Sequence, residues 1–163
     1  MKVSFEQIKN MTLGAEIVRQ EVDGIHFYRF TEEQQELYIA RGTQFSQELS
    51  TTGICLRFLT DSKKLYLKVF TSMGSCRNYF SFDIRVDGKL FDSINNYYSI
   101  EKDVFPDNVE PLGEFEKEVS LPCGEKEICI YFPWSVCGVL KELTLDDNSF
   151  IYSARGFPQS NFA

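Results

Sequence analysis

The sequence predicts an all-β protein, an antiparallel β-sandwich or jelly roll with one or two short helices near the N-terminus. Apolar and polar residues alternate with a period of two over most of the chain, and turn residues separate the alternating runs. Aromatic residues make up 15% of the composition. Strands place successive side chains on opposite faces, and Phe and Tyr are enriched in them. Strands do not alternate with long helices, which disfavours a parallel α/β sheet.

The chain length fits a single domain. Its 163 residues fall within the range of about 100–200 residues per domain. A domain of this size buries about 68–70% of its unfolded surface, so we expect it to fold without disulfides or metal. The predicted domain covers residues 1–152. Residues 153–163 show no strand periodicity and are expected to form a C-terminal tail or the start of an interdomain linker.

Two short helices are predicted near the N-terminus because two capping boxes occur there. Ser4 and Thr31 are each followed, three residues later, by Gln. In this motif the hydroxyl and the Gln side chain each bond a backbone N–H group that the first helical turn leaves unpaired. The second helix is expected to continue through residues 36–40 and to end near Gly42.

The alternating runs define eight or nine short strands separated by turns, which is typical of a sandwich or barrel. The run at residues 80–87 alternates apolar and polar residues without a break, and Asp87 and Gly88 then fit a type I′ hairpin turn. A last pair of strands flanks an acidic turn at residues 146–148. The predicted strands are residues 25–30, 54–59, 65–70, 80–87, 89–91, 115–121, 128–132, 139–145 and 150–152.

The five cysteines, Cys55, Cys76, Cys123, Cys129 and Cys137, are odd in number and contain no Cys-x-x-Cys pair. Cys55 and Cys129 each lie within an apolar run. We therefore expect free thiols that pack as small hydrophobic side chains, not disulfides or metal ligands. The single His excludes sites built from several histidines. No metal and no cofactor are expected.

The charge and the hydropathy of the chain exclude several partners. A formal net charge of −7 repels phosphate backbones, and no cluster of Lys and Arg opposes it, so we expect no nucleic-acid binding. The N-terminus lacks the uninterrupted apolar stretch of roughly 7–15 residues that a secretory signal needs. No run approaches the ~20 apolar residues of a membrane span. These features predict a cytoplasmic protein that does not bind a membrane.

Two short motifs carry residue types used in catalysis or metal binding. Asp23 and His26 have a spacing that lets a carboxylate orient an imidazole in some hydrolases, but the chain contains no Gly-x-Ser-x-Gly or Gly-Asp-Ser sequence. A turn that leads into a strand explains these two residues. A small hydrolase that uses His26 is the other interpretation of this motif. The acidic turn at residues 146–148 could supply oxygens to calcium, but a solvated surface turn is far commoner. No catalytic residue is predicted.

Carbohydrate contact is the remaining candidate chemistry. Sugars present flat apolar C–H faces that pack on aromatic rings, whereas their hydroxyl groups need polar neighbours. Tyr97 and Tyr98 follow two Asn residues in the longest irregular stretch, and Trp134 lies at the end of a strand. These three residues are the predicted carbohydrate-binding residues. Alternatively, the aromatic rings close the ends of the sandwich.

An ordered set of six short motifs extends over residues 8–151. The motifs are LGA (13–15), DGIHFYRFT (23–31), GICLRFLTDS (53–62), FDIRVDG (82–88), IYFPW (130–134) and LTL (143–145). The set resembles the N-terminal β-sandwich domain that precedes the catalytic domain in some SGNH (GDSL-type) esterases. This resemblance implies a jelly-roll-like accessory domain beside a three-layer α/β hydrolase domain. Such enzymes deacylate esters, often acylated sugars, with a Ser-His-Asp set and Gly and Asn oxyanion donors.

None of the family's catalytic residues can be assigned to this chain. The Gly-Asp-Ser block should follow the accessory domain, and the Asp-x-x-His motif of the family lies near the far C-terminus, so the match at Asp23 and His26 is coincidental. The resemblance therefore implies a non-catalytic accessory domain that packs on an SGNH-type catalytic domain and helps shape its substrate cleft. Its implied partners are that domain, in the same or a former polypeptide, and an acylated carbohydrate. Aromatic patches left uncovered would favour self-association. The alternative is a free-standing carbohydrate-binding module.

Overall fold

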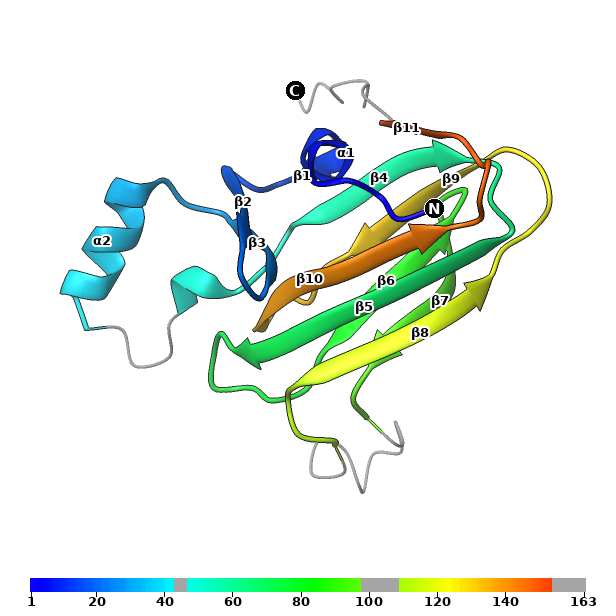
Figure 1. Cartoon of the computed structure of the whole chain (residues 1–163). Helices are drawn as coiled ribbons and strands as arrows, with labels where there is room; N and C mark the ends of the chain where they lie inside the picture. The colour runs from blue at the N-terminus through cyan, green and yellow to red at the C-terminus, as the bar shows by residue number, and fades with distance from the viewer. Residues whose placement is uncertain (43–46, 98–108, 154–163) are drawn as a thin grey trace, which may run out of the picture.

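Two antiparallel sheets pack face to face in the computed structural model, which describes residues 1–42, 47–97 and 109–153 (Figure 1). The first sheet has the strand order β2-β3-β10-β5-β8. The second has the order β1-β4-β9-β6-β7, and β11 also pairs with β4. The predicted all-β sandwich is confirmed. Of the predicted tail at residues 153–163, Ser153 is the last residue of β11 and residues 154–163 lie outside the described residues, so the domain boundary stays a prediction.

The strand boundaries follow the predicted runs closely, with additions at the N-terminal end. The first sheet contains β2 (Ile17–Glu21), β3 (Gly24–Tyr28), β10 (Val136–Leu145), β5 (Lys64–Met73) and β8 (Glu114–Ser120). The second contains β1 (Thr12–Leu13), β4 (Cys55–Thr60), β9 (Lys126–Tyr131), β6 (Ser81–Val86), β7 (Lys89–Asn95) and β11 (Ile151–Ser153). The chain crosses between sheets after β10, so the last two strands do not pair with each other.

Both predicted helices form, and both begin with a complete capping box. Helix α1 (Phe5–Met11) buries Ile8 and Met11 against the sandwich. Helix α2 (Glu32–Ala40) has no buried residue and projects to one side of the two sheets (Figure 1). A short 3₁₀ helix (Gln47–Leu49) precedes β4. In the described part of the chain, neither α-helix has the length and apolar character needed to cross a membrane.

The β6–β7 hairpin turns as predicted. Asp87 has a φ of 48° and Gly88 a φ of 77°. Positive φ at both central residues is the requirement of a type I′ turn, whose twist matches that of the flanking strands. The turn brings β7 beside β6 as the edge strand of the second sheet, with Leu90 opposite Arg85.

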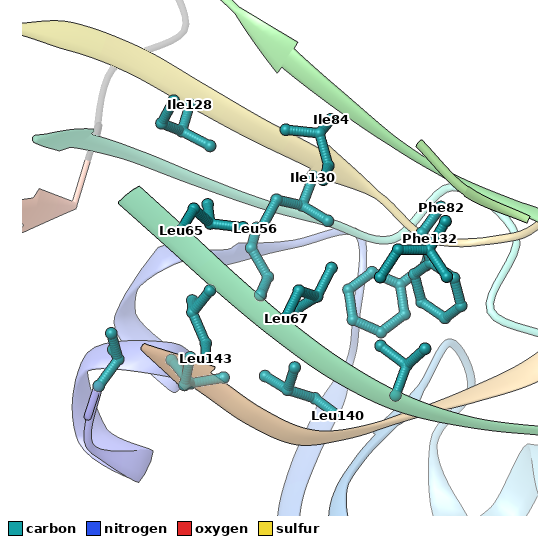
Figure 2. Packing of buried hydrophobic residues seen from close by; sticks show 14 of the residues in the cluster. Leu56, Leu65, Leu67, Phe82, Ile84, Ile128, Ile130, Phe132, Leu140 and Leu143 are labelled. Atoms are coloured by element: carbon teal, nitrogen blue, oxygen red, sulfur yellow. The ribbon is translucent and has the colours of Figure 1, made fainter. Parts of the chain in front are cut away.

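The core lies between the two sheets and consists of inward-facing aliphatic and aromatic side chains (Figure 2). The period-two pattern is obeyed on β6, where Phe82 and Ile84 are fully buried while Asp83 and Arg85 are not. Burial of this apolar surface is the main force that holds the sheets together. The labelled core side chains are Leu56, Leu65, Leu67, Phe82, Ile84, Ile128, Ile130, Phe132, Leu140 and Leu143.

The cysteines are free thiols, as expected, but only some are packed as hydrophobic side chains. Cys55 and Cys129 are buried and Cys137 is partly buried, whereas Cys76 and Cys123 are exposed. The expectation is therefore confirmed for Cys55 and Cys129 and wrong for the two exposed thiols. Cys76 and Cys123 lie in connections between strands, where no neighbouring sheet covers them.

Candidate functional site

A hollow of about 580 Å³ opens on the outer side of the second sheet. We call it the aromatic groove because six of its nine lining residues carry aromatic rings. Trp134 is 55% exposed and Tyr131 is 40% exposed, so both rings are available to a ligand. The aromatic lining residues are Tyr79, Phe80, Tyr97, Tyr131, Phe132 and Trp134, and the others are Ser81, Asp83 and Leu90.

Trp134 is held in place by its short loop, which connects β9 to β10. The Thr51 hydroxyl donates to the carbonyl oxygens of Pro133 and Val136, at 3.0 and 3.2 Å. The neighbouring Thr52 hydroxyl donates to the carbonyl oxygen of Trp134 itself. Carbonyl groups on both sides of the ring are thus hydrogen-bonded to one segment of the chain. The exposed indole therefore projects from a fixed backbone.

Tyr97 is positioned by its neighbour Asn96, which is buried. The Asn96 side chain accepts a hydrogen bond from the backbone N–H of Phe80 at 2.9 Å. It donates to the carbonyl oxygens of Asn78 and Glu110, both at 2.8 Å. One amide thus joins three separate backbone segments beside the groove. Tyr97, the next residue, forms an isolated bridge with Val109.

The floor of the groove is formed by two buried rings, Phe80 and Phe132. Both contact Phe82 edge-on, with ring centroids 5.8 and 5.1 Å away. Gly138 on β10 lies directly below, since a Cβ atom there would come within 2.8 Å of the Phe82 ring and 3.2 Å of the Phe132 ring. The absence of a side chain at Gly138 therefore allows the aromatic floor to pack against the opposite sheet.

The polar residues of the groove come from β6. Asp83 and Tyr131 are paired across β6 and β9, so both side chains point away from the core. The Ser81 hydroxyl donates to Oδ1 of Asp83 at 2.6 Å. An aromatic face beside a carboxylate and a hydroxyl offers the two kinds of contact that a sugar ring needs.

A pair of buried thiols adjoins the groove. The register pairs Cys55 with Tyr131 and Arg57 with Cys129, so the two cysteines are diagonal neighbours on β4 and β9. A hydrogen bond with Cys55, assisted by one with Tyr131, lowers the pKa of Cys129 despite its burial. The hydrogen bond with Cys129 raises the pKa of Cys55 and also that of Tyr131. The Tyr131 phenol, which lines the groove, is thus hydrogen-bonded to Cys129, and this bond keeps it protonated to higher pH.

The structure brings two of the three predicted carbohydrate-binding residues together. Tyr97 and Trp134 line the same groove although they lie in different connections of the chain. Tyr98 lies outside the described residues. The sequence patterns did not single out Tyr79, Tyr131 or Asp83. Alternation places Tyr131 and Asp83 outward on their strands, but it does not reveal which strands are neighbours.

His26 lies in the β2–β3 hairpin of the first sheet and not in the groove. Its Nε2 atom is 2.7 Å from Oδ1 of Asp23 and 3.8 Å from Oε2 of Glu21. The hydrogen bond with His26 lowers the pKa of Asp23. Among the described residues no hydroxyl or thiol group is hydrogen-bonded to His26. Glu21, Asp23 and His26 are also the one group of three metal-ligand residues found in the described ranges.

The carboxylates of the acidic turn after β10 have protein partners. Asp146 accepts hydrogen bonds from the backbone N–H of Lys63 at 2.7 Å and from the Ser62 hydroxyl at 3.3 Å. Asp147 forms an ion pair of 2.8 Å with the N-terminal ammonium group. These contacts join the N-terminus and the β4–β5 turn to the end of β10. They explain the acidic turn as a structural feature and agree with its interpretation as a surface turn.

Comparison with known proteins adds the fold relationship. No family model matches the sequence, and no curated protein does. A solved salicylyl-acyltransferase from a tetracycline biosynthetic pathway superposes with a TM-score of 0.70 and 20% identity. That match covers 90% of this chain and 39% of the acyltransferase. The fold is shared.

A second solved structure has the same relationship to the sandwich. A GDSL-like lipase of Bacteroides ovatus, described as putative, superposes with a TM-score of 0.56 and 14% identity. The match covers 94% of this chain and 42% of the lipase. The chain thus spans about two fifths of both solved chains. The fold shared with part of an acyltransferase and part of a GDSL-like lipase agrees with the β-sandwich expected from the sequence motifs.

Proposed function

We propose that this chain is a non-catalytic accessory domain of a GDSL-type (SGNH) enzyme, which packs on a catalytic domain and helps shape its substrate cleft. The shared fold carries the proposal, since nearly the whole chain matches only about two fifths of an acyltransferase and of a GDSL-like lipase. The absence of a nucleophile hydrogen-bonded to His26 within the described residues supports a non-catalytic role. In this proposal the parent protein is a cytoplasmic ester hydrolase.

The two outer sides of the sandwich support different roles. Ion pairs lie on the outer side of the first sheet, where Lys68 contacts Glu114 and Glu116 at 2.7 and 3.4 Å. Such paired charges are typical of a solvated surface. The second sheet exposes more aromatic and aliphatic side chains, among them Leu90 and Phe91 at 63% and 45%, although Phe70 and Met73 of the first sheet are also exposed. Exposed apolar patches mark interaction sites, so the second sheet is the side we assign to a partner domain or substrate.

The alternative is a free-standing carbohydrate-binding module, and the aromatic groove is the observation that favours it. Trp134 and Tyr97 line one hollow with Asp83, which matches the mixed apolar and polar character of sugars. In the accessory-domain proposal the same groove contacts the acylated carbohydrate substrate. Both interpretations therefore place a glycan on this surface. They differ in whether the native protein also contains a catalytic domain.

The intact mass of the native gene product separates the two interpretations. The accessory-domain proposal expects a mass well above 18.9 kDa, the mass of this chain, with a GDSL-type catalytic sequence in the remainder. A native product of 18.9 kDa would contradict it and leave the free-standing module. Sedimentation of the isolated chain then tests self-association through the second sheet, which Leu90→Ser should weaken.

Two solution assays test the role of the chain itself. Titration with acetylated and plain oligosaccharides should show binding that Trp134→Ala or Tyr97→Ala removes, with an unchanged circular dichroism spectrum. A lack of binding to every glycan would count against both interpretations of the groove. Turnover of an acetyl ester by the 163-residue chain, abolished by His26→Ala, would overturn the non-catalytic role in favour of a small hydrolase.

A further inference from the structure

Two arginines stack on the exposed rings of the aromatic groove. The guanidinium carbon of Arg77 is 4.3 Å from the centroid of the Trp134 ring, and that of Arg85 is 5.5 Å from the Tyr131 ring. Across the described ranges, no carboxylate oxygen lies within 4.0 Å of either guanidinium group. As far as the described residues show, these two positive charges beside the groove have no acidic partner.

Acidic residues are present on the same sheet, but they form ion pairs with other cationic side chains. Glu127 pairs with Arg57 at 2.6 Å, and Asp92 pairs with Lys117 at 2.6 Å. In contrast, Nε of Arg85 is buried and has no hydrogen-bond partner among the described residues, although Nη1 of the same side chain donates to the backbone carbonyl oxygen of Gly88 at 3.3 Å. Buried N–H groups are normally satisfied, so an unpaired one on a side chain that stacks on Tyr131, a lining residue of the groove, is compatible with an acceptor supplied by a ligand.

Asp83 can accept a further hydrogen bond, whereas the two arginines can donate them. Its Oδ1 atom accepts from the Ser81 hydroxyl, and no donor to its Oδ2 atom occurs in the described part of the chain. A carboxylate with one free oxygen accepts hydrogen bonds from hydroxyl groups. Flat aromatic faces and one acceptor for hydroxyl groups thus line the groove. Two guanidinium groups that lack an acidic partner within the described ranges stack on two of its rings.

We propose that the groove binds an acidic oligosaccharide that carries uronic acid residues, an inference that rests on the proposed glycan binding. The sugar ring packs on Trp134 and Tyr131, and its carboxylate is bound by Arg77 and Arg85. Planar guanidinium groups match the geometry of a carboxylate, and hydrogen bonds between charged groups are stronger than neutral ones. The net charge of −7 opposes binding only weakly, because charges beyond about 8 Å are screened at physiological ionic strength.

The test compares one oligosaccharide in two charge states. Trp134 is the single tryptophan, so its fluorescence reports directly on the groove. The chain is titrated with tri-galacturonate and with its full methyl ester, which keeps the skeleton and removes the negative charges. We expect the free acid to bind about tenfold more tightly, the worth of one charged hydrogen bond. The preference should weaken as salt is raised.

Variants assign the preference to the two arginines. Arg77→Gln, at an exposed position, and Arg85→Gln should each remove most of the preference for the free acid, while Arg85→Lys keeps part of it. Arg19→Gln is the matched control, because Arg19 pairs with Glu32 on α2, away from the groove lining. It should leave both affinities unchanged.

Three outcomes would overturn the inference, and they are distinguishable from one another. Equal affinity for the acid and the ester would disprove recognition of the carboxylate while leaving glycan binding in the groove intact. Failure of both compounds and of neutral xylo-oligosaccharides to bind would disprove the carboxylate inference together with the glycan-binding proposal. An unchanged preference for the free acid in Arg77→Gln and in Arg85→Gln would exclude these two residues as the groups that bind the carboxylate.

Discussion

The guanidinium group of Arg77 lies over the indole ring of Trp134, 4.3 Å from its centroid. Arg77 belongs to the β5–β6 connection and Trp134 to the β9–β10 connection, so this contact joins two loops at one end of the sandwich. A guanidinium on an aromatic face is attracted by the ring and also covers it. The contact therefore limits how much of the indole meets solvent before a ligand arrives.

Arg77→Ala is expected to expose more of Trp134. Quenching of its fluorescence by acrylamide should increase, because the guanidinium no longer covers one face of the ring. The free energy of unfolding should fall by less than about 1 kcal/mol, since an exposed cation–π contact is weak. Arg41→Ala, at the end of α2, is the control and should leave the quenching unchanged. Equal quenching in the two variants would mean that Arg77 does not shield the indole in solution.

Asn96→Ala is expected to destabilise the groove strongly. The change leaves the N–H of Phe80 and the carbonyl groups of Asn78 and Glu110 without their side-chain partner. Unsatisfied buried polar groups cost about 1–3 kcal/mol each, and we expect a total loss of about 3 kcal/mol in urea denaturation. Asn95→Ala, which removes one hydrogen bond to Ser93, should cost less than about 1 kcal/mol. Similar losses at both positions would argue against the role assigned to Asn96.

Gly138→Ala is expected to disturb the aromatic floor of the groove. The new methyl group would lie 2.8 Å from Cζ of Phe82 and 3.2 Å from Cδ1 of Phe132, both closer than a normal contact. Overpacking of this kind costs about 1–3 kcal/mol, measured as a lower thermal midpoint. Gly113→Ala provides the comparison, because no described atom lies within 4 Å of the position that its new methyl group would take, and its backbone is ordinary. A tolerated Gly138→Ala would show that the two rings can move aside.

The pKa of Cys129, lowered chiefly by its hydrogen bond with Cys55, predicts an unusual labelling profile. Between about pH 6 and 9, alkylation of Cys129 should rise at lower pH than that of Cys137, whose pKa is raised by burial. Mass spectrometry of the labelled peptides distinguishes the two sites. Cys55→Ala should move the Cys129 profile to higher pH, and an unmoved profile would contradict the assigned cause.

Ionisation of Cys129 also makes the free energy of unfolding depend on pH. Because the folded-state pKa of Cys129 lies below the unfolded value, its thiolate stabilises the fold above the unfolded pKa. That contribution is lost as the pH falls through the folded pKa. Comparison of the pH dependence of unfolding in the native chain and in Cys129→Ser between about pH 6 and 8, where Cys55 and Tyr131 stay mostly protonated, tests it, and identical profiles would exclude the effect.

Much of the local structure could be predicted from the residues alone. Ser4 and Thr31 marked the starts of both helices, because their hydroxyl groups cap unpaired N–H groups within four residues. Asp87 and Gly88 predicted their hairpin for an equally local reason, the need for positive φ. Strand β2 was not predicted, because its last three residues, Arg19, Gln20 and Glu21, are all exposed and do not alternate with apolar residues. Edge strands have one partner and a weak apolar pattern, so sequence periodicity identifies them poorly.

The groove could be predicted only in part. Tyr97 and Trp134 were predicted as ligand contacts because aromatic residues in loops near polar ones fit sugar binding. Their proximity was not predictable, since it depends on the hydrogen bonds of Asn96 and Thr51 to distant backbone groups. The stacking of Arg77 on Trp134 depends in the same way on which strand connections meet at one end of the sandwich.

The sequence by itself determined the class of the fold, because capping, turn geometry and alternation act between residues a few positions apart. It also determined which side chains of β6 point outward, with Asp83 and Arg85 opposite the buried Phe82. The tertiary structure decided which strands became neighbours, and thereby placed Asp83 beside Tyr131 and Cys129 beside Cys55. Sheet order follows from how all the apolar faces are buried together, so no single segment of the chain contains it.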